Sequence, residues 1–96
     1  MSDMVEVENV NTPGRKSRVN AAKYADMLQA FEKALPKACP GLTQAETRDA
    51  VKLHLSDGLF PSGETAGWWA KTVQLDLEAK GKLVREATKP LRWHWK

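Results

Sequence analysis

The stretch AGWWAKTVQLDLEAKG, Ala66 to Gly81, has the apolar spacing of an amphipathic helix and carries two adjacent tryptophans. Neighbouring residues on a helix point about 100° apart, so Trp68 and Trp69 cannot both lie at the centre of one buried stripe. A helical wheel groups five side chains around one direction: Ala66, Trp69, Ala70, Val73 and Leu77. The stretch therefore predicts a helix over residues 64–80 that turns Trp69 toward the core.

The opposite side of this helix carries a second row of side chains, of which Trp68 is the largest. The row consists of Trp68, Thr72, Leu75 and Ala79. Two interpretations of it stay open. Either the chain's own tail, arm or hairpin covers the row, or its apolar members form an interface with another protein or a second copy of the chain. The second interpretation follows from the tendency of aromatic patches outside a core to mark interfaces.

Two further helices are predicted ahead of this stretch, each from the residues at its start. Asn20 is a candidate N-cap for a helix over residues 21–35, whose apolar side chains recur three and four positions apart. Thr43 and Glu46 have the spacing of a capping box, in which each side chain binds the other residue's backbone amide. They predict a second helix over residues 44–55.

The long third helix has candidate start and stop residues, and a hairpin is predicted after it. Ser62 or Thr65 is suited to cap its start, and Gly81 to end it in the left-handed conformation. After Gly81 the apolar period becomes alternating, which is typical of strands, so we expect a β-hairpin near residues 82–95. One face of its second strand carries Leu91, Trp93 and Trp95, and the other carries Arg92, His94 and Lys96. The indole rings should pack against the core that receives Trp69.

The first nineteen residues have no helical period. Three acidic residues come first, followed by the turn signal Thr12-Pro13-Gly14 and then by a basic cluster. We interpret residues 1–19 as a flexible acidic tail and a basic arm, in which Val5, Val7 and Val10 are candidates for an edge strand. Residues 20–96 form the predicted domain.

Length and composition restrict the class of protein. A chain of 96 residues with 42% hydrophobic content suits one domain with one core. The single cysteine, Cys39, excludes an internal disulfide or a thiolate metal cluster within one chain, which fits a reducing compartment. There is no apolar run of about 18 residues and no signal-like start. We therefore expect a cytoplasmic protein that does not enter a membrane.

The net charge of +3 is unevenly distributed, with the basic residues concentrated near both ends of the chain. The basic side chains near the ends are Arg15, Lys16, Arg18, Lys23, Lys80, Lys82, Arg85, Lys89, Arg92 and Lys96. Two interpretations remain open here as well. These side chains form either a solvated surface or a set of phosphate contacts, and the second requires them to converge on one face.

The order of these predicted elements resembles the winged helix-turn-helix, an α+β fold of three helices with a C-terminal β-hairpin. The resemblance covers residues 20–96 and is carried by three segments: LTQAETRDAV (42–51), GWWAKTVQLDLEAKGKLVRE (67–86) and KPLRWHW (89–95). LEAKGKLVRE is similar to the place where a winged helix leaves its recognition helix and enters the wing. The chain also resembles a small uncharacterised bacterial family that shares the tryptophan-rich third helix and the KPLRW ending, which adds no activity.

The winged-helix resemblance implies nucleic-acid binding, with the third helix in the major groove and the wing on the backbone. The residues it places at such an interface are Arg15, Lys16, Arg18, Thr65, Lys71, Thr72, Lys82, Arg85, Lys89 and Arg92. The third helix and its flanks carry two lysines and three carboxylates: Lys71 and Lys80, and Glu64, Asp76 and Glu78. The outer row of the helix is apolar. Both features argue against direct readout of bases. The leading hypothesis is therefore a module that binds duplex DNA through a basic wing and arm with weak sequence preference. The rival is a protein-interaction or homodimerisation module that uses Trp68, Leu75 and Ala79.

No catalytic residues and no cofactor or metal are expected. His54 and His94 lie far apart in the chain, and Cys39 stands between prolines in a predicted loop. Catalysis needs a nucleophile and a base held within hydrogen-bond reach, and no pair of this kind is recognisable. A glycine loop that cradles phosphate is also missing from the sequence. These patterns favour a non-catalytic binding protein.

Overall fold

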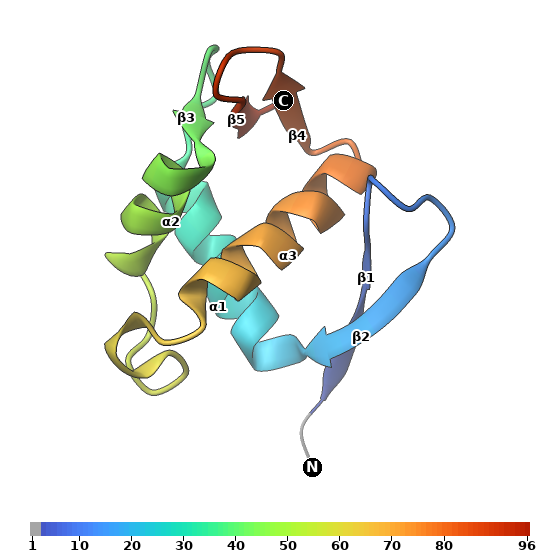
Figure 1. Ribbon diagram of the computed structural model, residues 1–96. Coiled ribbons are helices and arrows are strands. Elements are labelled where there is room, and N and C mark those ends of the chain that lie inside the picture. Colours follow the sequence, from blue (N-terminus) through green and yellow to red (C-terminus); the bar gives the residue numbers. More distant parts are fainter. Residues whose placement is uncertain (1–2) are drawn as a thin grey trace.

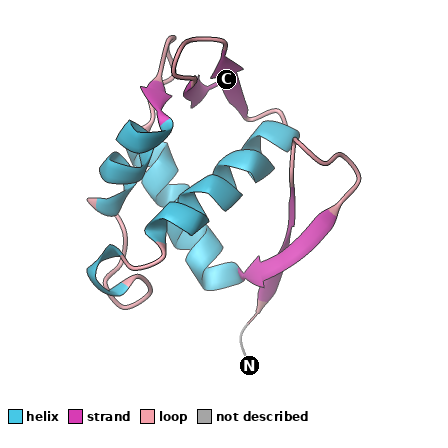
Figure 2. Cartoon of the chain, in the orientation of Figure 1, coloured by secondary structure: helices cyan, strands magenta, loops and turns pink. Residues whose placement is uncertain are grey.

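The computed structural model describes residues 3–96, which form a small α+β domain with three α-helices and two small antiparallel sheets (Figure 1). In chain order the elements are β1 (Met4–Glu8), β2 (Lys16–Asn20), α1 (Ala21–Ala34), β3 (Leu42–Thr43), α2 (Gln44–Lys52), the 3-10 turn η1 (Pro61–Gly63), α3 (Ala66–Ala79), β4 (Leu83–Glu86) and β5 (Arg92–Trp95). α3 crosses the front of the molecule with α1 behind it. The two groups of strands lie at separate ends of the helical layer (Figure 2).

The predicted starts of α1 and α2 are confirmed. The Asn20 side chain accepts the amide of Lys23 at 3.0 Å, which caps α1. The Thr43 hydroxyl accepts the amide of Glu46 at 3.2 Å, and the Glu46 carboxylate accepts the amide of Thr43 at 2.9 Å, so both halves of the capping box are present. Each pair satisfies backbone amides that have no partner inside the helix.

α2 is shorter than the predicted helix over residues 44–55, because it ends at Lys52. The amide of Leu53 binds the carbonyl of Ala50 at 3.3 Å, and the amide of His54 binds that of Val51 at 3.0 Å. These bonds span three residues in place of four, which tightens the last turn and stops the helix.

The start of α3 differs from the prediction, whereas its end agrees. The helix begins at Ala66, after Ser62 and Thr65 have adopted positive φ angles of 55° and 60°. The Thr65 hydroxyl donates to the carbonyl of Glu64 and makes no capping bond, so neither proposed cap acts through its side chain. Gly81 has the expected positive φ of 72°. Its amide and that of Lys82 bind carbonyls of the last helical turn, which is the Schellman arrangement.

The hydrophobic core is formed by residues of all three helices and both sheets, and the predicted stripe of α3 is confirmed. All five of its residues, Ala66, Trp69, Ala70, Val73 and Leu77, are buried. Trp69 is 7% exposed and packs edge-on against Phe60. Trp93 joins the same cluster, with Trp95 packed against it, so the hairpin does direct its indole rings into the core.

The C-terminal hairpin β4–β5 is antiparallel as predicted, and β3 adds a third strand to it in the order β3–β5–β4. β3 pairs with β5 in the register Leu42 with Trp93. A strand of two residues has no detectable period, which is why the sequence did not indicate it. His94, predicted on the face of this strand opposite Trp93, is buried, because its side chain lies next to the loop that contains Cys39.

The N-terminal segment has a different structure from the tail and arm that we expected. β1 and β2 form an antiparallel hairpin in which Val5 pairs with Val19 and Val7 with Ser17. Val7 and Val19 are buried in the core, and burial of their side chains explains why the segment packs on α3 and α1. Val10 lies outside the strands, and residues 1–2 of the predicted tail lie outside the described residues. Across residues 3–96, the structure has no helix with the length and apolar content needed to cross a membrane.

Candidate nucleic-acid interface

The outer row of α3 is divided into an exposed part and a covered part. Trp68 is 59% exposed, and Thr72 one turn further along is half-buried. Leu75 is only 8% exposed because the β1–β2 hairpin packs over the second half of the helix, and Ala79 is half-buried. The accessible outer face of α3 is therefore its first half, where Trp68, Lys71 and Thr72 lie.

Both carboxylates within α3 accept hydrogen bonds from other groups of the same chain. Asp76 is fully buried and accepts bonds from the Tyr24 hydroxyl, from the Glu8 amide at 2.8 Å and from the Lys80 ammonium at 2.9 Å. The Glu78 side chain, 5% exposed, accepts two bonds from Arg85 and one from the Trp93 indole at 2.6 Å. Burial, with the bond to Asp76, raises the pKa of Tyr24. The outer face of α3 thus presents a lysine and no exposed carboxylate of the helix itself.

Some of the cations predicted to contact phosphate are held by carboxylates of the same chain. Arg85 binds Glu78 through two hydrogen bonds, which raise the pKa of Arg85. Arg92 donates to Glu46 at 3.2 Å and to the carbonyl of Gly41 at 3.1 Å. Lys16 lies 3.6 Å from Glu6 across the N-terminal hairpin. These three side chains have partners within the chain and are therefore less available for a ligand.

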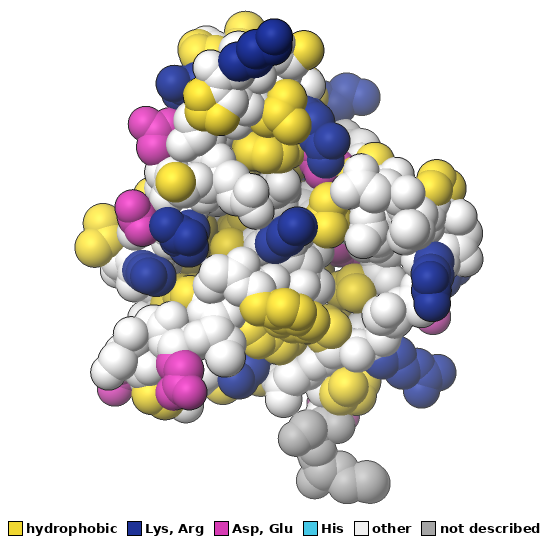
Figure 3. Space-filling view, viewed as in Figure 1, with side chains coloured by type: hydrophobic (Ala, Val, Ile, Leu, Met, Phe, Trp, Pro, Cys, Tyr) yellow, Lys and Arg dark blue, Asp and Glu magenta, His cyan; other side chains and the backbone are white. Residues whose placement is uncertain are grey.

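The remaining predicted cations are exposed: Arg15, Arg18, Lys71, Lys82 and Lys89. No carboxylate within residues 3–96 forms an ion pair with any of them. Thr65 is exposed next to the start of α3. On the face that carries α3, dark-blue Lys and Arg side chains are spread around a central apolar patch, and Asp and Glu are fewer (Figure 3).

A groove runs between the N-terminal hairpin and α3. We call it the α3–hairpin groove, and the residues that line it include Thr12, Arg15, Ser17, Trp68, Thr72 and Leu75. It brings Arg15 of the predicted arm to the same surface as Trp68 and Thr72 of the predicted recognition helix. The sequence named these residues separately, and the docking of the hairpin places them together.

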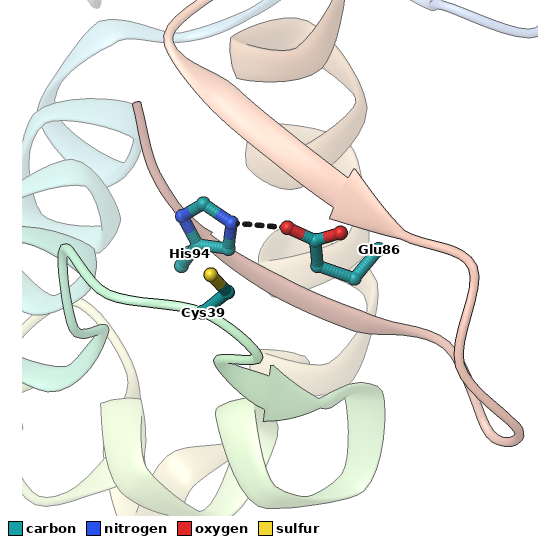
Figure 4. Close-up of side chains that lie close together, drawn as sticks. All are labelled: Cys39, Glu86 and His94. Atoms are coloured by element: carbon teal, nitrogen blue, oxygen red, sulfur yellow. Dashed lines mark hydrogen bonds and ion pairs between the residues drawn. The ribbon is translucent and has the colours of Figure 1, made fainter.

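A second group of chemically active side chains was missed by the sequence analysis. Cys39, Glu86 and His94 lie together at the second sheet, with one ligand atom from each residue within 4.8 Å of the others (Figure 4). His94 Nε2 is 2.7 Å from the Glu86 carboxylate, and His94 Nδ1 is 2.8 Å from the carbonyl oxygen of Trp95. Both contacts raise the pKa of His94, that to Glu86 most. Residues 39, 86 and 94 have no local spacing that indicates such a cluster.

The chain matches the model of a protein family. A protein-family model described as a family of unknown function (DUF6958) matches residues 4–93. The match begins at β1 and ends within β5, so it includes the N-terminal hairpin as well as the helices. No curated protein and no solved structure matches the chain.

Proposed function

We propose that this chain, which belongs to the DUF6958 family, is a nucleic-acid-binding module of winged-helix type that binds duplex DNA chiefly through its phosphates. The proposal assigns the wing to β4, β5 and the turn between them, and the recognition helix to α3. Sequence preference should be weak, because phosphate contacts hold a protein on the duplex without reading its bases.

The arrangement of the elements supports the winged-helix assignment. α1, α2 and α3 precede the antiparallel hairpin β4–β5, and β3 between α1 and α2 pairs with β5. α3 lies at the front of the molecule, and the turn between β4 and β5 lies at the top of the view (Figure 1). A helix and a wing on one face are what a winged-helix protein presents to DNA.

The observation that carries the proposal is the distribution of charge around α3. Asp76 and Glu78 are turned inward and satisfied by donors of the same chain, so they do not repel a phosphate at the outer face. Lys71 is exposed on that face, and Lys82 follows the end of the helix. Two of the three carboxylates that argued against DNA in the sequence are therefore neutralised inside the folded chain, and only Glu64, ahead of the helix, is exposed.

Weak sequence preference is supported by what covers α3. Leu75 is buried under the hairpin, so the second half of the helix is blocked from a major groove. The first half presents Trp68 and Thr72, whereas base edges are normally read by arginine, lysine, asparagine or glutamine. Lys71 is the one such side chain on the exposed part of the described helix.

A fluorescence-anisotropy titration with random-sequence duplex DNA at several salt concentrations tests this function. If the five unpaired cations each contact a phosphate, the logarithm of the association constant should fall with the logarithm of salt with a slope of about −4 to −5. Absence of binding at low salt, about 50 mM, would refute the proposal.

Charge-reversal variants locate the contacts. The double variant Lys82→Glu and Lys89→Glu should weaken binding and reduce the magnitude of the salt slope by about 2. Lys33→Glu is the matched control, because Lys33 is an exposed lysine on α1, the helix that lies behind α3. Equal losses per reversed charge in the control and in the double variant would show that net charge alone, without a defined face, determines binding.

A second candidate function rests on Trp68. A tryptophan that is 59% exposed at the rim of a groove is typical of a protein interface, so the rival is an interaction or homodimerisation module. Leu75 and Ala79, the other members of the predicted interface, are covered and half-buried, which leaves Trp68 as its main apolar contact. Trp68→Ala should abolish self-association in sedimentation measurements if the rival is correct, and leave the salt slope of DNA binding unchanged.

A further inference from the structure

Three side chains of different elements converge at the outer side of the second sheet. Cys39 comes from the loop between α1 and β3, Glu86 from the end of β4 and His94 from the middle of β5 (Figure 4). Their sulfur, carboxylate oxygen and imidazole nitrogen all lie within 4.8 Å of one another. His94 is buried, Glu86 is half-buried and Cys39 is exposed, so solvent reaches the group from the loop side.

The fold holds the three side chains in place through backbone contacts. Leu42 pairs with Trp93, which lays the preceding loop beside His94. Gly41 has a φ of +88°, and a Cβ on it would overlap the carbonyl oxygen of Trp93, so only glycine permits this close approach. The Arg92 guanidinium also donates to the carbonyl of Gly41 at 3.1 Å. Cys39 is therefore kept next to β5 by its own loop.

The ring of His94 is oriented as in a metal ligand. Its Nδ1 is 2.8 Å from the carbonyl oxygen of Trp95. Because a carbonyl oxygen can only accept a hydrogen bond, Nδ1 carries a hydrogen and donates it. Nε2 is then directed toward Glu86, and the Cys39 sulfur lies beside the ring (Figure 4). A backbone carbonyl on the far nitrogen is the common way in which proteins fix the tautomer of a metal-binding histidine.

We propose that Cys39, Glu86 and His94 form a binding site for a single Zn²⁺ ion. A thiolate, an imidazole and a carboxylate are the three ligand types that zinc accepts, whereas Mg²⁺ and Ca²⁺ require oxygen. Three protein ligands leave the fourth tetrahedral position to water. On binding, the thiol proton of Cys39 and the proton held between His94 Nε2 and Glu86 pass to solvent, and the contact between His94 and Glu86 opens to admit the ion.

The same geometry disfavours a catalytic triad of these residues. In a triad, one imidazole nitrogen faces the nucleophile while the other is held by the acid. Here Nε2 is bound to Glu86 and Nδ1 to the carbonyl of Trp95, so neither nitrogen is left for the Cys39 thiol.

Titration of the metal-free full chain with Zn²⁺ in competition with a chromophoric chelator tests the site. The expected result is one ion per chain and a melting temperature that rises until that ratio is reached. Cobalt(II) in place of zinc should give the charge-transfer absorption of a thiolate ligand. No binding, or a ratio of one ion to two chains, would overturn a site built within one chain.

Ligand variants identify the residues involved. Cys39→Ser should remove the cobalt–thiolate band and lower zinc affinity at least about tenfold, and it concerns an exposed residue, so the fold is retained. Glu86→Gln and His94→Gln should lower the affinity as well. His54→Gln is the matched control, since His54 is the other histidine of the chain and lies outside the cluster. Unchanged binding by Cys39→Ser would overturn the proposal even if His94→Gln failed to fold.

Discussion

At the level of single residues, Asp76 connects three parts of the molecule. It is fully buried on α3, yet it accepts bonds from Tyr24 of α1, from the amide of Glu8 on β1 and from Lys80. A buried carboxylate is tolerated only when it is paired and hydrogen-bonded. Asp76 therefore serves to join the N-terminal hairpin to α3 and α1.

Asp76→Ala should destabilise the protein by about 2–4 kcal/mol, because the hydroxyl of Tyr24 and the amide of Glu8 lose their acceptor inside the fold. The free energy of unfolding in urea gives the measurement. Asp49→Ala is the control, since Asp49 is exposed on α2, and it should change stability by less than about 0.5 kcal/mol. A small loss at Asp76 would mean that water replaces the carboxylate.

The two adjacent tryptophans should contribute very different amounts to the free energy of unfolding. Trp69→Ala removes a 7% exposed ring from the core and should cost about 3–5 kcal/mol. Trp68→Ala removes a ring that is 59% exposed and touches Trp69 edge-on, so a loss of about 1 kcal/mol is expected. Urea denaturation of both variants measures the difference. Similar losses would contradict the assignment of Trp69 as the core tryptophan.

At the level of elements, the capping box of α2 connects stability to pH. The backbone amide of Thr43 donates to the Glu46 carboxylate, and this bond, with Arg92 nearby, lowers the pKa of Glu46. A carboxyl group with a lowered folded pKa stabilises the protein above its unfolded pKa of about 4.3. That stabilisation is lost as the pH falls through the folded value.

Glu46→Ala should therefore lower the urea midpoint at pH 7 and have a smaller effect once the pH has fallen below the lowered folded pKa of Glu46, where the carboxylate of the parent protein is protonated. Glu64→Ala serves as the control, because Glu64 is an exposed glutamate that belongs to no capping box. A penalty for Glu46→Ala that does not depend on pH would show that the charge of Glu46 does not stabilise α2.

At the level of the whole molecule, the N-terminal hairpin shares one core with the helices. Val7 and Val19 belong to the same cluster as Phe31 and Trp69, and β1 contacts both α3 and α1. Because one core should melt as one unit, the hairpin is expected to unfold together with the rest. The family match, which starts at residue 4, covers the same extent of chain.

Val7→Ala should cost about 2 kcal/mol from the methyl groups removed from the core. Val10→Ala, at a residue that is 36% exposed, should cost less than about 0.5 kcal/mol. Tryptophan fluorescence and far-UV circular dichroism should follow a single coincident transition in both variants. A separate early transition for Val7→Ala would show that the hairpin is a detachable arm.

The sequence by itself determined the local elements: the caps at Asn20 and Thr43, the stop at Gly81 and the choice of Trp69 over Trp68. These features depend on residues within about four positions of one another, where periodicity and capping chemistry operate. Only the tertiary structure decided that the hairpin covers Leu75, that Asp76 and Glu78 turn inward, and that Cys39 meets His94. Those facts depend on pairings between distant segments, such as Leu42 with Trp93, whose register is fixed by packing and leaves no periodic trace in the chain.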